Sequence, residues 1–367
     1  MLKIQQQVPL LKYNTLALPS KAEYFCEITS ETELCEALLW ARQKQLSITL
    51  LGGGSNVVLV GDLAGLIIHI AIPGIALAKG ELVSGIDSTQ FERIIRVGAG
   101  ENWHQLVLYT LEQGWYGLEN LSLIPGLTGA APIQNIGAYG VELSDRFHSL
   151  EAIELSSGES ITMTRSDCQF GYRDSFFKGA GRDQYAITAI NLRLSTKADL
   201  CLEYPALKTY LETESLETKS LETEGIEGKS LGNKSVTPVT PKQVSDAVCA
   251  IRHSKLPNPK DIANAGSFFK NPVISSEQLK VLQKQYPKLV SYDQANGTKK
   301  LAAGWLVEQA GWKGVTRSGV GVHDKQALVL VNYQGTGKAL LSLAEDVQAS
   351  VAEKFAITLD IEPRVYT

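Results

Sequence analysis

The run Ile48–Val60 (ITLLGGGSNVVLV) most constrains how this chain can fold. An apolar segment rich in β-formers meets three glycines and two small polar residues, and a valine-rich segment follows, which predicts a strand, a tight turn and a second strand. Glycines permit positive φ and let backbone N–H groups approach a phosphate, and serine and asparagine add donors. We therefore expect a dinucleotide or nucleotide diphosphate here, with a plain hairpin turn as the alternative. The turn residues are Gly52, Gly53, Gly54, Ser55 and Asn56.

Two better-known phosphate-binding motifs do not fit the sequence. A Rossmann fingerprint requires a third glycine at position 57 and a helix after it, but Val57 opens a segment that favours a strand. The triplet Gly228–Ser230 resembles the end of a P-loop, yet Thr223 occupies the position of the leading glycine. The glycine turn is therefore a different kind of site.

Composition limits the classes of protein that this chain can be. With 367 residues and 44% hydrophobic content, we expect two or three domains with substantial cores. A formal net charge of −4 and the lack of a basic run argue against a nucleic-acid partner. Five widely spaced cysteines without a C-x-x-C pair indicate neither a disulfide framework nor a metal site. No segment resembles a secretion signal or a membrane span, so we expect a cytoplasmic protein without a membrane partner.

Helical and strand patterns are mixed along the chain. A capping box at Ser30 and Glu33 predicts a first helix, and Asn102 and Thr240 are the expected N-caps of two others. The other expected helices are Leu301–Ala310 and Lys338–Phe355. The expected strands are Leu63–Ile72, a hairpin over Leu150–Thr164, Ala186–Leu194, a buried strand Gln326–Asn332, and a final strand that carries Glu362 and Arg364.

The segment Gly117–Gly140 is rich in glycine, alanine and proline, and Glu119 is its one charged residue. A solvated linker would be more polar, so we expect this backbone to pack closely against another element or an extended cofactor.

Three further places in the sequence carry residues that could belong to a site. Tyr172 and Arg173 follow a glycine and suit a carboxylate or phosphate, although a surface ion pair is the alternative. Ser267 lies in NAGSFFKNP, where flanking aromatic side chains predict a rigid, dry pocket. His69 is expected to be a satisfied histidine in or beside the core.

Short polar pentads recur from Leu211 to Ser235, each with one apolar residue. Their period matches neither a helix nor a strand, so we expect a flexible surface insertion.

Taken together, the motifs GGGSN, GENWH, IPG, PIQNIGAYGVEL, FGYRDS, NAGSFFKNP, LAAGWL and the terminal ExR resemble the UDP-N-acetylenolpyruvoylglucosamine reductase family, of the type with a tyrosine loop over the substrate. They occur in order along nearly the whole chain. The resemblance implies an α+β fold with a two-lobed FAD-binding domain of the vanillyl-alcohol-oxidase type and a separate α+β substrate domain. The implied ranges are 1–72 for lobe 1, joined by a returning strand 356–367, 73–200 for lobe 2, and 201–355 for the substrate domain.

The same resemblance implies reduction of UDP-N-acetylglucosamine-enolpyruvate by NADPH through non-covalent FAD. Arg173 matches the residue that stabilises the developing negative charge, Ser267 the proton donor, and Glu362 a third catalytic position. We hypothesise that Glu362 is protonated or paired with a cation, because a bare carboxylate would repel the intermediate. The implied cofactor residues beyond the glycine turn are Ile124, Pro125, Gly126, Gln134, Asn135, Ile136, Gly137, Tyr139 and Arg364. The implied substrate contacts are Tyr172, Tyr204, Lys255, Asn271 and Gln326, with Lys255 expected at the diphosphate.

Two other functions remain open at this point. One is a flavin oxidase of the same superfamily, and the other is a non-catalytic UDP-sugar-binding protein. The expected enzyme is a monomer.

Overall fold

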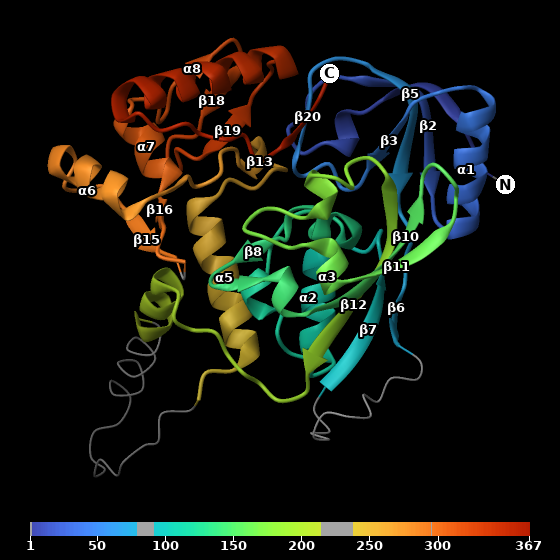
Figure 1. Ribbon diagram of the computed structural model, residues 1–367, viewed down its shortest axis with the longest axis horizontal. Coiled ribbons are helices and arrows are strands. Elements are labelled where there is room, and N and C mark those ends of the chain that lie inside the picture. Colours follow the sequence, from blue (N-terminus) through green and yellow to red (C-terminus); the bar gives the residue numbers. More distant parts are fainter. Residues whose placement is uncertain (1, 79–91, 214–237, 295) are drawn as a thin grey trace, which may run out of the picture. The chain divides into compact units, whose positions relative to one another are not determined.

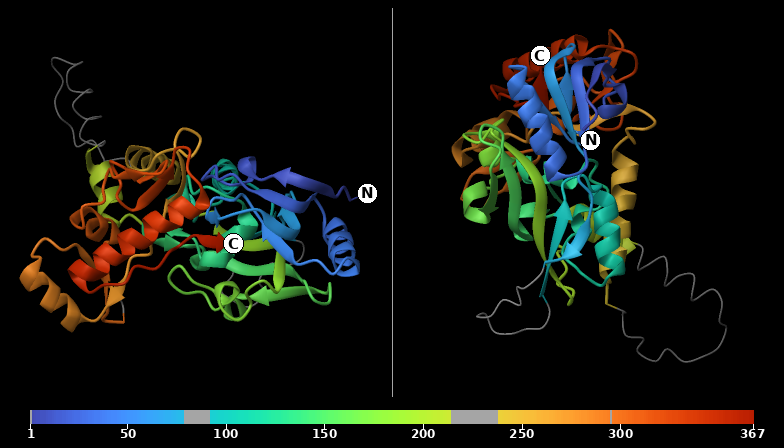
Figure 2. Two further views of the ribbon diagram at one scale, coloured as in Figure 1. Left: turned by 90° about the horizontal axis from the view of Figure 1, so that it is seen from above. Right: turned by 90° about the vertical axis from the view of Figure 1, so that its right-hand side faces the viewer.

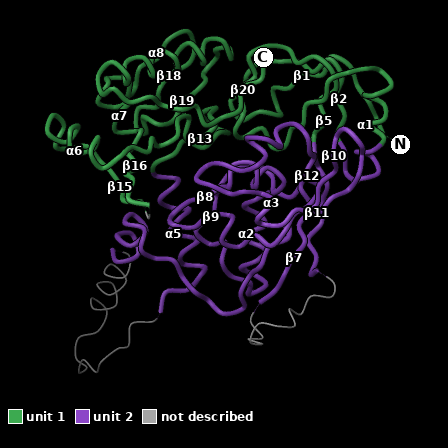
Figure 3. The backbone as a smooth tube through the Cα atoms, viewed as in Figure 1, with its two compact units in different colours: residues 1–27, 36–69, 255–367 green, residues 28–35, 70–254 purple. Residues whose placement is uncertain are grey.

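The computed structural model describes residues 2–78, 92–213, 238–294 and 296–367. The chain divides into two compact units, shown in two colours in Figure 3. Unit 1 combines residues 1–27, 36–69 and 255–367, and unit 2 combines residues 28–35 and 70–254. Sequence-distant ends of the chain thus fold together in unit 1. The division into three domains at residues 72, 200 and 355 stays a prediction.

The N-terminal part of unit 1 is built around a sheet with the strand order β1-β2-β5-β3. These strands are β1 Gln5–Pro9, β2 Lys21–Ile28, β5 Leu63–Ile70 and β3 Ile48–Leu51, and helix α1 covers Glu31–Gln43. Strand β4 (Val57–Leu59) follows the glycine turn. The predicted strand, turn and strand are therefore confirmed.

The two strands that flank the glycine turn do not pair with each other. Strand β3 runs parallel to β5, with Ile48 opposite Leu66, and β4 runs parallel to β20 (Arg364–Tyr366). The alternative of a plain hairpin is therefore wrong: the turn passes between two separate ladders. Glu362 lies just before β20 rather than within it, which corrects the predicted extent of the last strand.

The described C-terminal residues of unit 1, 256–294 and 296–367, form two small sheets and the helices α6, α7 and α8, which Figure 1 labels. One sheet has the order β13-β19-β18-β17, and the other β14-β16-β15. Helix α8 packs against β18 and α7, as Figures 1 and 2 show. The bounds are β13 Ala263–Ser267, β14 Val273–Ile274, α6 Ser276–Gln285, β15 Ser291–Asp293, β16 Lys299–Leu301, α7 Ala303–Gln309, β17 Thr316–Arg317, β18 Val320–Val322, β19 Val329–Asn332 and α8 Gly337–Phe355.

Two predicted bounds in this part are too wide. The helix expected from Leu301 begins at Ala303, because Leu301 belongs to β16. The strand expected from Gln326 begins at Val329, because the Val329 N–H donates to the Gln326 carbonyl at 3.0 Å in a turn. A turn thus interrupts the apolar run before Val329, whereas the extended N-cap Ala302 separates β16 from α7.

Unit 2 is built around a sheet with the order β11-β10-β12-β7-β6, whose long strands are visible in Figure 2. Its core includes Trp103, Leu150 and Ile190. The bounds are β6 Ile75–Leu77, β7 Glu92–Gly98, α2 Trp103–Glu112, η2 Glu119–Leu121, η3 Thr128–Gln134, β8 Gly137–Ala138, β9 Val141–Glu142, η4 Leu143–Asp145, β10 Phe147–Glu154, β11 Ser160–Thr164, α3 Arg165–Cys168, η5 Phe176–Lys178, β12 Tyr185–Ser195 and α5 Pro241–Lys255.

The predicted helix starts in unit 2 agree with the structure. The Asn102 side chain accepts a hydrogen bond from the Gln105 N–H at 3.0 Å, and the Thr240 hydroxyl accepts from the Gln243 N–H at 3.3 Å. Each cap satisfies a donor that the first helical turn leaves unpaired. The hairpin over Leu150–Thr164 is confirmed as the antiparallel pair β10 and β11.

The predicted insertion Leu211–Ser235 lies mostly outside the described residues. Residues 205–213 are helical, so its first three residues continue a helix, which corrects the predicted start. Within the described ranges, none of the helices combines the length and the apolar character that crossing a membrane requires.

Candidate functional site

In unit 1, backbone hydrogen bonds connect the glycine turn with the segment that carries Ser267. The Thr15 N–H donates to the Gly54 carbonyl at 3.0 Å, and the Asn264 N–H donates to the Thr15 carbonyl at 3.0 Å. Asn264 opens the NAGS run, three residues before Ser267. Two segments that are about 200 residues apart in the sequence therefore meet through Thr15.

The C-terminal segment links the same two places. The Glu362 N–H donates to the Phe268 carbonyl at 2.8 Å, and the Arg364 N–H donates to the Asn56 carbonyl at 3.0 Å. Glu362 is thus attached beside Ser267, whereas Arg364 is attached to the glycine turn. Unit 1 therefore brings together four features that the sequence singled out.

Local backbone geometry presents Ser267. Strand β13 is irregular between Asn264 and Ser267, where Gly266 has a φ of +70° and donates its N–H to the Asn264 side chain at 2.9 Å. The fully buried rings of Phe268 and Phe269 follow and anchor the strand end. Ser267 itself is half-buried, and its hydroxyl makes no hydrogen bond within the described ranges of the chain. This hydroxyl is available to a ligand.

In unit 2, a tight turn presents Arg173. Gly171 and Asp174 exchange backbone hydrogen bonds of 3.0 and 3.2 Å, which leaves Tyr172 and Arg173 at the tip. Arg173 has a φ of 53°, a left-handed conformation that non-glycine residues seldom adopt. Such strain persists only where the surroundings enforce it, and it often marks functional positions.

The turn is attached to the predicted cofactor segment by three side chains. Arg173 donates from Nη2 to the Gly137 carbonyl at 2.7 Å, the buried Asn135 amide donates to the Gly171 carbonyl at 3.1 Å, and Ser175 Oγ donates to the Ile133 carbonyl at 2.7 Å. The Gly137 bond fixes the orientation of the guanidinium. The structure thus brings Arg173 and Gln134–Tyr139 together.

Tyr204, the tyrosine expected to cover the substrate, contacts the segment Gln134–Tyr139. The rings of Tyr139 and Tyr204 form an edge-to-face pair with centroids 5.2 Å apart. The Asn120 amide, which is 2% exposed, donates to the Tyr139 carbonyl at 2.9 Å and to the Cys201 carbonyl at 2.8 Å. One buried side chain therefore joins the cofactor segment and the segment that leads to Tyr204.

Arg252 on α5 is a charged residue of this site that the sequence patterns do not predict. Its Nε atom is buried and makes no hydrogen bond with any residue that the structure describes. Burial lowers the pKa of Arg252. The nearby Arg173 lowers this pKa further, whereas Tyr139 and Cys249 raise it. A half-buried arginine with a buried Nε near a second arginine favours an anionic ligand. A lone arginine on an amphipathic helix gives no such signal in the sequence.

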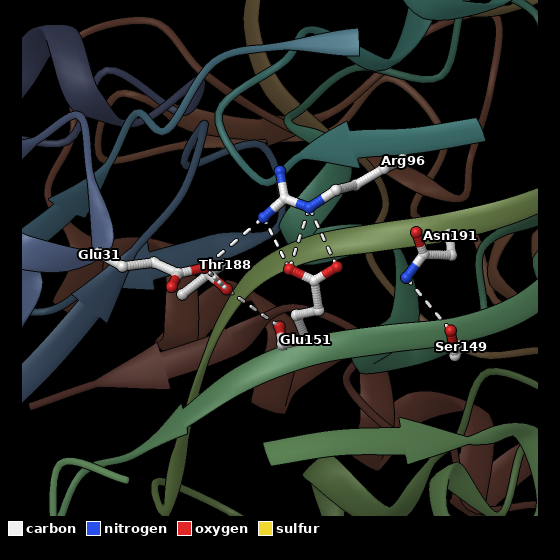
Figure 4. Close-up of polar contacts among 6 residues, drawn as sticks. All are labelled: Glu31, Arg96, Ser149, Glu151, Thr188 and Asn191. Carbon is white, nitrogen blue, oxygen red and sulfur yellow. Dashed lines mark hydrogen bonds and ion pairs between the residues drawn. The ribbon is translucent and has the colours of Figure 1, made fainter. Parts of the chain in front are cut away.

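Arg96 in unit 2, unlike Arg252, is surrounded by acidic partners (Figure 4). Arg96 Nε donates to both carboxylate oxygens of Glu151 at 3.0 Å, and Nη2 lies 3.6 Å from Glu31. Thr188 donates to Glu31 at 2.9 Å. The acidic partners raise the pKa of Arg96, mainly through the Glu151 hydrogen bond. This cluster is internally paired and has a structural role.

The remaining predicted substrate residues are distributed over both units. Asn271 accepts from the Ala303 N–H at 2.9 Å and so caps α7, which is a structural role of its own. Gln326 accepts from the Leu328 N–H at 3.4 Å. Lys255 is exposed at the end of α5, and Tyr204 is 39% exposed. His69 Nδ1 lies 3.1 Å from a Glu27 carboxylate oxygen, and the ring centroids of His69 and Tyr13 are 5.1 Å apart. The histidine therefore has partners within the protein, as expected.

Each unit, taken by itself, has backbone features that suit an anionic ligand. The turn from Gly52 to Asn56 is half-buried apart from the buried Gly54, so its backbone remains accessible. In unit 2, positive φ values recur at Leu123, Gly126 and Tyr139. Irregular backbone of this kind and the buried Arg252 Nε suit an anionic ligand.

Comparisons with known proteins agree with these features. The model of a UDP-N-acetylenolpyruvoylglucosamine reductase C-terminal domain matches residues 258–366, and an FAD binding domain model matches residues 22–164. A UDP-N-acetylenolpyruvoylglucosamine reductase of Chromobacterium violaceum is 42% identical over 366 residues, covering 99% of both chains. The protein of the same name from Pseudomonas putida is 41% identical and covers 99% of this chain and 98% of its own length.

A solved structure shows the same fold. The UDP-N-acetylenolpyruvylglucosamine reductase of Thermus caldophilus aligns over 100% of both chains with a TM-score of 0.63, at 20% sequence identity. Together with the FAD binding domain match, this alignment confirms the predicted fold class, an α+β fold with an FAD-binding part and a separate C-terminal domain.

Proposed function

The chain belongs to the UDP-N-acetylenolpyruvoylglucosamine reductase family, and we propose that it reduces UDP-N-acetylglucosamine-enolpyruvate to UDP-N-acetylmuramate with NADPH and FAD. This reaction supplies a peptidoglycan precursor. The supporting observation is the connection of the glycine turn, the Ser267 segment, Glu362 and Arg364 in unit 1. We propose that the protein acts as a monomer in the cytoplasm. Because its product is used to build the cell wall, its activity would affect cell shape and cell division.

FAD would be held by the accessible backbone of the glycine turn, by Arg364 and by the segment with positive φ values that includes Gly126 and Tyr139. When bound, it supplies hydride transfer between NADPH and the enolpyruvyl group. No residue is proposed to form a covalent link to it.

The surroundings of the three catalytic candidates support the roles that the family resemblance implies. Ser267 presents a hydroxyl that is protonated at every working pH, so it can give a proton to a strongly basic carbon. Arg173 carries a fixed cation whose orientation is set by the Gly137 carbonyl, which suits a carboxylate that gains negative charge. Glu362 is proposed to act as a proton relay or an orienting group, and its protonation state stays a hypothesis.

The substrate is proposed to contact Tyr172, Tyr204, Lys255, Asn271 and Gln326. Lys255 is exposed and can reach a diphosphate as a point charge. Because the Asn271 side-chain oxygen already accepts from Ala303, its amide N–H groups are the donors proposed for the ligand.

Two simple experiments distinguish the rival functions from the proposal. A colourless protein that takes up no FAD would indicate a non-catalytic UDP-sugar-binding protein. Reduced protein that reacts rapidly with oxygen, and not with the enolpyruvyl sugar, would indicate a flavin oxidase.

The proposal is tested directly by Ser267→Ala. We expect NADPH to reduce the flavin at nearly the normal rate, while reoxidation by the enolpyruvyl sugar falls by about 10³-fold, because the proton donor is missing. Anaerobic stopped-flow absorbance measures both half-reactions.

Ser276→Ala is the matched control, since Ser276 donates to the Gly297 carbonyl away from the proposed site. It should leave both half-reactions unchanged. Normal reoxidation of the Ser267→Ala protein by substrate would remove Ser267 from its proposed role.

A further inference from the structure

The motif GENWH contributes two residues, Trp103 and His104, to the start of α2. Neither has a role in the site described so far. Both make hydrogen bonds to the loop Leu121–Gly126, which contains the proposed cofactor residues Ile124, Pro125 and Gly126.

Three hydrogen bonds hold this loop to α2. Trp103 Nε1 donates to the Leu121 carbonyl at 3.0 Å, and the Trp103 N–H donates to the Gly126 carbonyl at 3.1 Å. Between these two ends, His104 Nδ1 accepts from the Leu123 N–H at 3.0 Å. The His104 bond is therefore the one at the middle of the loop.

Leu123 needs such a restraint. Its φ is 59°, and an L-residue with a branched side chain avoids this region because Cβ approaches the backbone. A positive φ at Leu123 sets the direction of the chain that enters Ile124 and Pro125. Without an acceptor for its N–H, Leu123 would relax toward ordinary backbone geometry.

His104 accepts this bond only while Nδ1 carries no proton, so the ring proton of the neutral side chain is on Nε2. Burial lowers the pKa of His104, and Arg252 and His253 on α5 lower it further. The surroundings thus favour the neutral ring. Protonation would place an N–H donor opposite the Leu123 N–H and break the bond.

We propose that His104 is a positioning residue whose Nδ1 atom holds Leu123 in the left-handed conformation, and thereby sets the loop Leu121–Gly126 for FAD binding. This inference rests on the proposed function of Ile124, Pro125 and Gly126. It also implies that FAD affinity falls as the pH drops through the pKa of His104, below the ordinary histidine value of about 6.5.

The test compares two variants of the full-length protein, freed of FAD, by flavin fluorescence titration from pH 5 to pH 8. His104→Ala should weaken FAD binding about 5- to 20-fold at pH 7.5, because the acceptor is lost. His104→Asn should bind within about threefold of the unchanged protein, because its amide oxygen occupies the position of Nδ1. The Asn variant should also lack the loss of affinity at acid pH, since an amide does not titrate.

Hydrogen exchange of the Leu123 amide gives a second readout that does not depend on FAD. Protection of this amide should fall in His104→Ala and return in His104→Asn. The control is His148→Ala, which removes an Nδ1 contact with Arg193 at 3.2 Å in the β-sheet of unit 2 and should change neither measurement.

Normal FAD affinity in His104→Ala would overturn the inference, as would an equal loss in the Ala and Asn variants. Failure of the proposed function is distinct, because the unchanged protein would then bind no FAD at any pH.

Discussion

Single residues in unit 2 adopt strained conformations where the proposed site lies. Leu123, Tyr139 and Arg173 have φ values of 59°, 49° and 53°. Each left-handed non-glycine residue costs roughly 1–3 kcal/mol, so the surrounding hydrogen bonds must offset this cost. For Arg173 and Leu123 these bonds are known: the exchange between Gly171 and Asp174, and the His104 contact.

At the residue scale, we predict that Arg252→Met increases stability and reduces function. The lowered pKa of Arg252 means that the folded protein binds this proton less tightly than the unfolded chain, so the charge destabilises the fold. Methionine fills a similar volume without a charge. We expect the Tm to rise by about 2–5 °C, while kcat/KM falls by at least about tenfold because an anion-binding charge is lost.

The matched control is Arg96→Met. Because Arg96 is paired with Glu151, its replacement leaves a carboxylate without its partner and should lower the Tm without changing the kinetics. A lower Tm with normal kinetics in Arg252→Met would contradict our interpretation of the buried Arg252 Nε.

At the scale of elements, the glycine turn is restrained by packing as well as by its proposed ligand. A Cβ at Gly54 would lie 1.9 Å from the Tyr13 carbonyl oxygen, and its φ is +60°. We predict that Gly54→Ala destabilises the protein by about 2–4 kcal/mol and lowers FAD retention. Gly61→Ala is the control, since a Cβ there would meet no atom within 4 Å. Urea unfolding and flavin content after gel filtration measure both effects, and equal stability of the two variants would show that the turn is not tightly packed.

The 3-10 helix η2 connects several parts of unit 2. Asn120 holds Tyr139 and Cys201, while the hydroxyls of the buried Ser122 and Ser245 on α5 lie 2.7 Å apart. Asn120 therefore connects the proposed cofactor segment at Tyr139 with the segment that leads to Tyr204.

We predict that Asn120→Asp raises the KM for the UDP-sugar by about tenfold, since a carboxylate repels the two carbonyls and releases the Tyr204 segment. FAD reduction by NADPH should change much less. The control is Asn191→Asp, where the amide donates to Ser149 at 3.1 Å on the sheet (Figure 4). An unchanged KM in Asn120→Asp would rule out this connection.

At the scale of the whole molecule, unit 1 combines both ends of the chain, with β4 and β20 paired in parallel. Most of the pentad segment, Leu211–Ser235, falls between the described parts 92–213 and 238–294. From its composition we predict that deletion of residues 216–234 leaves kcat/KM within about threefold, since such a sequence cannot build a core. Steady-state kinetics of the deletion variant measure this ratio. A large loss of activity would contradict the prediction of a surface insertion.

The sequence by itself determined the local elements and the type of site. Periodicity and capping residues such as Asn102 predicted α2 and α5, and glycines between two β-rich runs predicted the turn. These features depend on neighbouring residues. The predicted bounds were wrong at Leu301, which pairs in β16, at Gln326, which lies in a turn, and at Glu362, which follows an isolated bridge between Ile361 and Phe269.

Only the tertiary structure decided which of these segments meet. The connection from Gly54 through Thr15 to Asn264 and the burial of Arg252 Nε leave no local pattern, because they depend on residues far apart in the chain. The same is true of the hydrogen bond between His104 and Leu123. Hydrogen bonds and desolvation act between neighbours in space, so the residues that a ligand would contact are known only once the chain has folded.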